Sequence, residues 1–243
     1  MSIRIAMWSG PRNISTAMMR SWENRPDTEV IDEPFYACYL KHTGAIHPYQ
    51  QEIMASQSDD FACVARQLSE APVSAAVQYQ KHMTHHIPEN ADMSWCASLR
   101  HCFLIRHPAK VVDSYYRSMG QCSEEETGIE RQFQLYQQLS EINSQPIPVV
   151  DSDDLLSAPK AMLEAICSAL EVPFYAQMLN WPTGRRPSDG VWAPHWYHSV
   201  EASTGFTAPS NKLPELSPEL QRIAERCQPF YEQMKGRAIQ IAG

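Results

Sequence analysis

Short apolar runs alternate along the chain with longer stretches in which apolar residues recur every three or four positions. The runs have the length and content of strands buried in a sheet, and they lie at 3–8, 29–32, 74–79, 101–105 and 147–150. Helix-compatible stretches lie between and after them, at 17–23, 35–40, 61–68, 108–117, 129–142, 159–170 and 217–235. Strands that alternate with helices are typical of an α/β fold, and we expect a parallel sheet flanked by helices.

Residues 43–60 have no clear period. This stretch predicts a loop, a mobile lid near the ligand face or a plain surface connection. The 243 residues contain no Gly/Ser run, charge block, low-complexity tract or internal repeat. We therefore expect a single domain over 1–243.

Charge and cysteine usage narrow the class of protein. The net charge of −8 disfavours a nucleic-acid partner, although a local cluster of cations would still allow an anionic ligand. Seven scattered cysteines without a C-x-x-C pair indicate reduced thiols. The sequence shows no signal-peptide h-region and no run of about 18 apolar residues. We expect a cytoplasmic protein without a membrane partner.

The turn at 9–13 joins the first predicted strand to the first predicted helix. This geometry points backbone N–H groups and a helix dipole at one spot, which suits an anion. The spacing partly matches a Walker A loop: Gly10 begins it, but Ser15 replaces the second glycine and Thr16 the lysine. Arg12 is left as the fixed cation, with a fork that fits phosphate or sulfate. The alternative is an edge strand followed by an incidental Gly-Pro turn.

Asp32 and Glu33 follow the second strand, at the edge where open α/β sheets bind ligands. Asp32 would suit the magnesium-holding acid of a phosphate-loop nucleotidase, and Glu33 a general base. The alternative for either residue is to cap the helix predicted at 35–40.

Lys81, His82, His85 and His86 follow the third strand, where they would suit proton transfer or anion contact. His82 and His86 are four residues apart, as in a helical zinc pair, but no acidic or Cys partner has matching spacing. Exposed loop histidines are the alternative.

Arg106 follows the strand at 101–105, and Ser114 lies eight residues further along the helix that Pro108 begins. An arginine and a hydroxyl on one face form a plausible phosphate clamp. A surface arginine beside a helical serine is the alternative reading, but Arg12 already marks a similar strand end.

The late stretch 183–197 contains Arg185, Arg186, glycines and aromatic residues without a regular period. Such a loop can stack a base and hold a phosphate. It could equally be a surface loop anchored by its aromatic side chains.

These segments, in this order, resemble the sulfotransferases that use 3′-phosphoadenosine 5′-phosphosulfate (PAPS). Residues 9–16 look like their 5′-phosphosulfate loop, and 104–117 like their 3′-phosphate motif. Glu33-Pro34-Phe35-Tyr36 is similar to the Glu-Pro-apolar-Tyr motif of carbohydrate-type and bacterial members, and 184–192 resembles their late glycine-basic loop. More narrowly, the chain resembles a bacterial sulfotransferase-like group that is labelled by association with branched-chain aminotransferases.

The resemblance implies the sulfotransferase fold, a P-loop-like parallel sheet, and transfer of a sulfuryl group from PAPS to a hydroxyl or amine. It implies no metal, and an acceptor that is a small molecule or carbohydrate. The implied PAPS- or PAP-binding residues are Gly10, Pro11, Arg12, Asn13, Ser15, Thr16, Arg106, Ser114, Arg185, Arg186 and Gly190. The implied catalytic residues are Arg12, Glu33 and His82, and the implied acceptor-binding residues are Glu33, Tyr36, Lys81 and His85.

Two other functions remain open from the sequence. One is a phosphate-loop kinase or nucleotidase that uses ATP and magnesium held by Asp32, although the loop lacks the lysine of such enzymes. The other is a PAP-binding module that does no chemistry.

Overall fold

The structure is a computed structural model that describes residues 2–210 and 212–241. The chain forms two compact units. The first comprises Met1–Met7, Thr16–Arg100 and Tyr175–Phe206, and the second comprises Trp8–Ser15, His101–Phe174 and Thr207–Gly243. The single domain expected from the sequence stays a prediction.

The strands form one sheet in the order β2-β3-β1-β4-β5. They are β1 (Ile3–Ser9), β2 (Thr28–Asp32), β3 (Val77–Met83), β4 (Arg100–Ile105) and β5 (Val149–Asp151). In the first unit, β2 pairs with β3 in parallel and Asp32 lies opposite Lys81. In the second unit, β4 pairs with β5 in parallel and Ile105 lies opposite Asp151. The α/β class and the parallel sheet predicted from the hydrophobic pattern are confirmed.

The helices of the first unit are mostly short. They are α1 (Ser15–Glu23, which begins at the last residue of the neighbouring unit), α2 (Tyr36–Thr43), α3 (Gln50–Ser56), α4 (Phe61–Glu70), α10 (Ala193–Trp196) and α11 (His198–Glu201). Three 3₁₀ turns accompany them: η1 (Thr84–His86), η2 (Ser94–Ser98) and η3 (Ala176–Leu179). Stacking of Trp22 of α1 on Tyr79 of β3, with ring centroids 5.3 Å apart, fixes α1 against the sheet.

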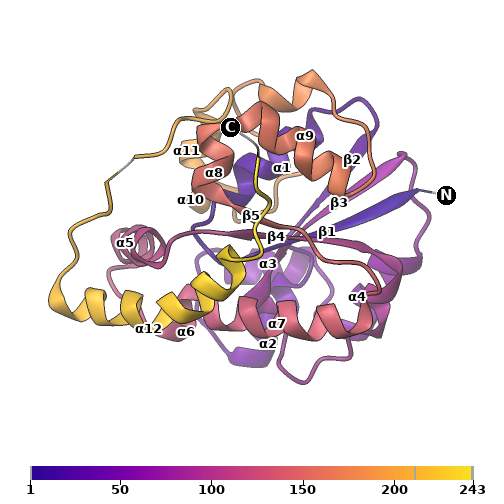
Figure 1. The fold of residues 1–243 in the computed structure, drawn as a ribbon. Helices are drawn as coiled ribbons and strands as arrows, with labels where there is room; N and C mark the ends of the chain where they lie inside the picture. The colour runs from indigo at the N-terminus through magenta and orange to yellow at the C-terminus, as the bar shows by residue number, and fades with distance from the viewer. Residues whose placement is uncertain (1, 211, 242–243) are drawn as a thin grey trace. The chain divides into compact units, whose positions relative to one another are not determined.

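The helices of the second unit are α5 (Pro108–Met119), α6 (Glu124–Thr127), α7 (Ile129–Ile142), α8 (Ser152–Ser157), α9 (Pro159–Ala169) and α12 (Pro218–Lys235). The long helix α12 runs alongside α5 and α7 (Figure 1). Ala109 and Val112 of α5 pack against Leu220 and Ala224 of α12 in one apolar cluster. This contact fixes α5, which carries the candidate binding residue Ser114.

The strongly patterned segments match their predictions, and the polar ones do not. Residues 129–142 form a helix with the predicted bounds. Residues 43–60, predicted as loop or lid, contain α3, whose Ile53 is fully buried. The strand expected to end at Tyr79 continues to Met83, because Gln80, Lys81 and His82 are buried with hydrogen-bond partners.

Within residues 2–210 and 212–241, no helix combines the length and the apolar character that a membrane span requires.

Candidate active site

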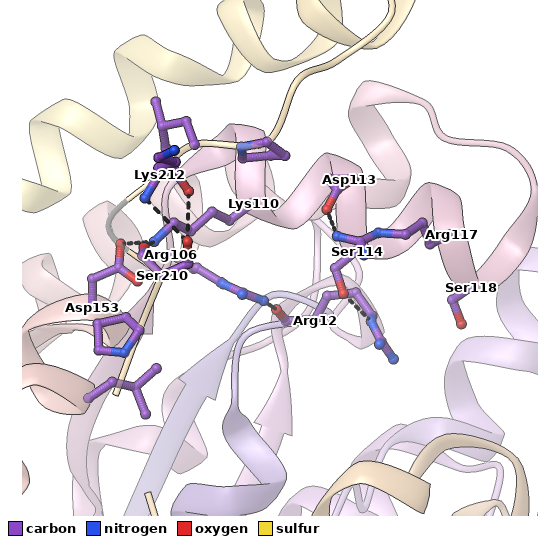
Figure 2. Close-up of a pocket in the computed structure, with 14 residues that line it drawn as sticks. Arg12, Arg106, Lys110, Asp113, Ser114, Arg117, Ser118, Asp153, Ser210 and Lys212 are labelled. Atoms are coloured by element: carbon purple, nitrogen blue, oxygen red, sulfur yellow. Dashed lines mark hydrogen bonds and ion pairs between the residues drawn. The ribbon is translucent and has the colours of Figure 1, made fainter. Parts of the chain in front are cut away.

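A cleft of about 600 Å³ opens in the second unit, and its walls carry more positive than negative charge. Five cations line it, Arg12, Arg106, Lys110, Arg117 and Lys212, together with the two carboxylates Asp113 and Asp153. Figure 2 shows these side chains gathered between the loop at Arg12, the helix with Ser114 and the segment at Ser210. A cationic cleft in a chain with a net charge of −8 indicates an anionic ligand.

The loop after β1 has a strained backbone that directs its N–H groups. Arg12 and Ile14 have positive φ angles of 59° and 43°, which are unfavourable for residues with a side chain and most unfavourable for β-branched Ile14. Turns of this kind form concave nests of N–H groups that bind anions. Arg106 Nη1 holds the turn by donating to the Arg12 carbonyl at 2.6 Å, and the buried Asn13 side chain donates to the Leu104 carbonyl.

Gly10 is required by packing. A Cβ atom at this position would lie 3.0 Å from the Thr127 carbonyl oxygen, immediately before α7. The glycine therefore allows the loop to approach the second unit's helices closely. Asn13, whose side chain anchors the loop to β4, also has a structural role here.

Arg12 and Arg106 keep hydrogen-bonding capacity for a ligand. Arg12 Nε donates to Ser114 Oγ at 3.0 Å, which brings the two predicted anion motifs together. Arg106 Nε is buried and has no hydrogen-bond partner within the described chain. Burial lowers the pKa of both guanidinium groups, because each loses hydration of its charge. An anion in the cleft would supply the missing acceptor and the missing counter-charge.

Two further segments complete the cleft. Lys110 Nζ donates to Asp153 Oδ2 at 2.8 Å and to the Ser210 carbonyl at 2.9 Å. Leu156, Pro209, Leu213 and Pro214 add apolar surface to the lining. A cleft that is lined by both charged and apolar side chains suits a nucleotide. The sequence motifs did not indicate the contribution of 209–214.

The first unit contains a buried cluster of charged groups built on β2 and β3. Lys81 Nζ donates to Asp32 Oδ1 at 2.9 Å, to Glu33 Oε1 at 2.5 Å and to the Tyr197 hydroxyl at 2.8 Å. The parallel register sets Asp32 opposite Lys81 and therefore creates the pair. The three N–H donors of the ammonium are all used within the cluster.

Asp32 is held by more than Lys81. The Tyr197 hydroxyl donates to its Oδ2 at 2.7 Å, and the Gly190 N–H donates to the same oxygen at 3.1 Å. Trp192 Nε1 in turn donates to the Tyr197 hydroxyl at 3.1 Å. Sequence reasoning missed Tyr197, because a single tyrosine 165 positions from its partner carries no local signal.

Glu33 combines unusual backbone and unusual electrostatics. Its φ angle of 39° lies in the left-handed region, and its N–H and carbonyl groups are bound to Lys81 and Gln57. Burial raises the pKa of Glu33, Lys81 opposes this shift and the charge of Asp32 adds to it. Burial alone would lower the pKa of Lys81, but the two carboxylates raise it. The result is a charged lysine beside a carboxylate with a raised pKa, which suits a general base.

The predicted histidines are placed differently from the expectation. His82 lies inside β3, is 1% exposed and contacts Gln80 through Nε2 at 3.1 Å. His86 lies in η1, so the helical spacing assumed for a zinc pair does not occur. Burial lowers the pKa of His85 to about 3 and that of His86 well below its usual value, so both are neutral near pH 7. The catalytic role of His82 and the acceptor-binding role of His85 stay predictions.

Tyr36 belongs to an aromatic group at the start of α2. Its hydroxyl lies 2.8 Å from His47 Nδ1, and its ring stacks on His86 with centroids 4.6 Å apart. The ring also meets Trp192 edge-on at 5.1 Å. Its role in binding an acceptor stays a prediction.

The side chains of the late loop contact groups within the first unit, and the nucleotide-binding role of Arg185, Arg186 and Gly190 stays a prediction. Arg185 pairs with Glu201 at 3.2 Å, and Arg186 Nη2 donates to the Pro182 carbonyl at 3.0 Å. Gly190 is a glycine because a Cβ atom there would lie 2.1 Å from the Trp192 ring. The residues that line the cleft include none of these three. The late residues that line the cleft come from 209–210 and 212–214.

Among the described residues, no group of three or more His, Cys, Asp or Glu side chains is arranged to hold a metal ion.

Solved structures define the class of fold. A sulfotransferase from Alicyclobacillus acidocaldarius matches 98% of this chain and 98% of its own length, with a TM-score of 0.59 and 10% identity. A sulfotransferase domain from the curacin biosynthetic pathway matches 93% of this chain and 97% of its own, with a TM-score of 0.53 and 16% identity. The sheet and helices described above are therefore those of the sulfotransferase fold.

Sequence comparison identifies the family. The profile of the sulfotransferase domain matches residues 3–238, so the chain belongs to the sulfotransferase domain family. Two curated relatives from Arabidopsis thaliana, named branched-chain-amino-acid aminotransferase-like protein 2 and protein 1, are 34% and 36% identical over 228 residues. These matches cover 93% of this chain, which spans only 40% of the length of the relatives.

Proposed function

We propose that the chain transfers a sulfuryl group from PAPS to a hydroxyl or amine of a small molecule or carbohydrate. The cationic cleft carries this proposal, because Arg12, Arg106 and Ser114 meet there and Arg106 Nε has no acceptor within the described chain. A donor with two separate phosphate groups would engage both arginines. A volume of about 600 Å³ accommodates a ligand of nucleotide size.

The residues of the cleft divide into two groups that fit such a donor. Arg12, its neighbouring N–H groups, Ser15 and Thr16 would bind the 5′-phosphosulfate at the nest and the start of α1. Arg106 and Ser114 would bind the 3′-phosphate. PAPS, when bound, supplies the activated sulfuryl group. The protein's part is to position the reacting groups and to neutralise the charge that develops.

Glu33 would take the proton from the acceptor. One contact from Lys81 leaves the carboxylate with further lone pairs, and its raised pKa makes it a stronger base than an exposed carboxylate. Lys81, implied by the resemblance to bind the acceptor, has its donors occupied by Asp32, Glu33 and Tyr197. Its role in this proposal is to hold Glu33 in place.

The environment of Asp32 counts against the kinase or nucleotidase alternative. Both its oxygens accept hydrogen bonds from Lys81, Tyr197 or Gly190. A magnesium ligand would have to give up these contacts. We therefore retain sulfuryl transfer as the proposed reaction.

The compartment proposed from the sequence is the cytoplasm. The described chain contains all seven cysteines and no disulfide, which fits a reducing environment.

A transfer assay tests this function. The protein is incubated with PAPS labelled in the sulfuryl group and with pools of hydroxyl- and amine-bearing acceptors, and the labelled product is separated. We expect product with the wild type, none detectable with Arg12→Ala, and about 10²- to 10⁴-fold less with Glu33→Gln.

Arg226→Ala is the matched control, because Arg226 is an exposed arginine of α12 that pairs with Glu124. It should keep full activity. Full activity in Arg12→Ala would contradict the proposal. Retained PAP binding without transfer to any acceptor class would favour the non-catalytic binding module.

A further inference from the structure

Tyr197 is the one member of the buried cluster that contacts both a carboxylate and the lysine. Its hydroxyl donates its single proton to Asp32, at 2.7 Å from Oδ2 and 2.9 Å from Oδ1. The same oxygen accepts from Lys81 at 2.8 Å and from Trp192 at 3.1 Å. A phenol group has one donor and two acceptor sites, so this hydroxyl is fully used.

Lys81 has three N–H donors, and three neighbouring groups share them. Its three donors reach Asp32, Glu33 and Tyr197, and the side chain is 1% exposed. Water therefore cannot replace a contact that is lost. If Asp32 loses a hydrogen bond from another donor, its interaction with Lys81 changes, and the hydrogen bond from Lys81 to Glu33 changes with it.

We propose that Tyr197 is a positioning residue for the transfer reaction: by satisfying Asp32, it leaves Lys81 free to hold the Glu33 carboxylate in its reactive place. The inference rests on the proposed function, in which Glu33 is the base. Tyr197 acts on Glu33 through Asp32 and Lys81 and also through its nearby hydroxyl, which lowers the pKa of that carboxyl, and it is not assigned a contact with the donor or the acceptor.

Close packing around Trp192 and Tyr197 fixes the position of the Tyr197 side chain. Gly190 must be a glycine for Trp192 to reach its place, since an added Cβ atom would overlap the indole ring at 2.1 Å. Trp192 is 1% exposed and Tyr197 is 3% exposed. The Lys81 ammonium also lies 5.1 Å from the Tyr197 ring centroid, which adds a cation–π contact.

The charged and titratable groups around Glu33 come from several elements. Asp32 precedes it on β2, Lys81 faces it from β3, Tyr36 lies at the start of α2 and Tyr197 lies between α10 and α11. Arg20 of α1 acts electrostatically on Tyr197, and His86 of η1 acts on Lys81. Of these groups, Tyr197 is the one whose hydroxyl contacts both Asp32 and Lys81, and this hydroxyl can be removed without removing a formal charge.

The test is a carbon-13 NMR titration of the full chain with labelled glutamate carboxyls, in which Glu33→Gln identifies the Glu33 signal. In Tyr197→Phe, Asp32 loses its closest donor and draws Lys81 away from Glu33, and Glu33 also loses the nearby hydroxyl that lowers its pKa. The pKa of Glu33 should then rise by about one unit. In the transfer assay, the acid limb of kcat should move up by a similar amount, while the KM for PAPS changes less than about twofold.

Tyr79→Phe is the matched control, because it removes another buried tyrosine hydroxyl from β3. It should leave the Glu33 titration unchanged. If Tyr197→Phe does not fold, 3-fluorotyrosine at position 197 preserves the shape. Its more acidic hydroxyl is a better donor to Asp32 and a weaker acceptor from Lys81, so the pKa of Glu33 should fall.

An unchanged Glu33 titration in both Tyr197 variants would overturn the inference, and so would shifts opposite to those stated. This readout does not require an acceptor. Absence of sulfuryl transfer in the wild type would overturn the proposed function instead, so the two failures are distinguishable.

Discussion

Lys81 is the residue on which the buried cluster of the first unit depends most. It forms ion pairs with two carboxylates at once, at 2.9 Å from Asp32 and 2.5 Å from Glu33, with almost no exposed surface. A buried ion pair adds little stability over an apolar pair, but removal of one partner leaves an uncompensated charge. Removal of the Lys81 charge should therefore lower the free energy of unfolding.

Replacement of Lys81 by methionine should destabilise the protein strongly. Two buried carboxylates would lose their counter-charge, so we expect a loss of about 3–5 kcal/mol in the free energy of unfolding. Urea denaturation measures it. Lys160→Met is the matched control on the exposed surface of α9 and should change stability by less than about 0.5 kcal/mol. Equal stability of the two variants would contradict the cluster's geometry.

At the residue scale, the sequence predicts a candidate site residue where a local motif contains it. It does not predict a residue whose contacts are made with distant parts of the chain. Arg12 and Arg106 each follow the end of a strand, and Ser114 lies on the helix that follows Arg106. The three side chains meet as expected. Tyr197 and Lys212 belong to irregular segments far along the chain from their neighbours. Lys81 was found, but its burial was not, because a charged residue in a strand usually marks an edge or an end.

At the scale of elements, the loop between β1 and α1 combines a close approach with a strained turn. Gly10 touches the carbonyl before α7, and Arg12 and Ile14 carry positive φ angles of 59° and 43°. The sequence predicted the strand, the turn and the helix correctly, and the anion-binding chemistry of the loop stays a prediction. It could not predict that Gly10 is needed for packing, because Thr127 lies more than a hundred residues away.

Gly10→Ala should shift this loop. The new methyl group would lie 3.0 Å from a backbone carbonyl that cannot move freely, so we expect a loss of about 1–3 kcal/mol in stability and weaker PAP binding. Thermal denaturation and calorimetry measure the two effects. In Gly236→Ala, the nearest atom would be 3.5 Å away, and this control should keep both properties. Unchanged PAP binding in Gly10→Ala would contradict the role given to the loop.

The turn η1 makes the first unit sensitive to acid. His85 and His86 stay unprotonated in the folded state, with lowered pKa values, about 3 for His85. Unfolded histidines bind protons near pH 6.5, so protons favour unfolding and stability falls as the pH drops below about 6.5. The melting temperature should therefore decline between about pH 7 and pH 5. The double variant His85→Gln/His86→Gln should weaken this dependence, and an equal slope would contradict it.

At the scale of the whole molecule, each unit has a separate task in the proposed function. The second unit holds the cationic cleft, and the first holds the carboxylate cluster. The family profile covers residues 3–238 and therefore both units. The alternation of strands and helices predicted this fold class from hydrophobic pattern alone. The acceptor is not encoded in such a pattern, since it depends on the shape and chemistry of loops.

The most direct test of the central claim is calorimetric titration of the whole chain with PAP. We expect binding on the order of micromolar affinity, lost in Arg106→Ala and retained in Arg226→Ala, which removes an exposed arginine. ATP with magnesium should give no binding signal. Absence of PAP binding, or ATP binding that requires magnesium, would contradict the assignment of the cleft to PAPS and favour a phosphate-loop nucleotidase.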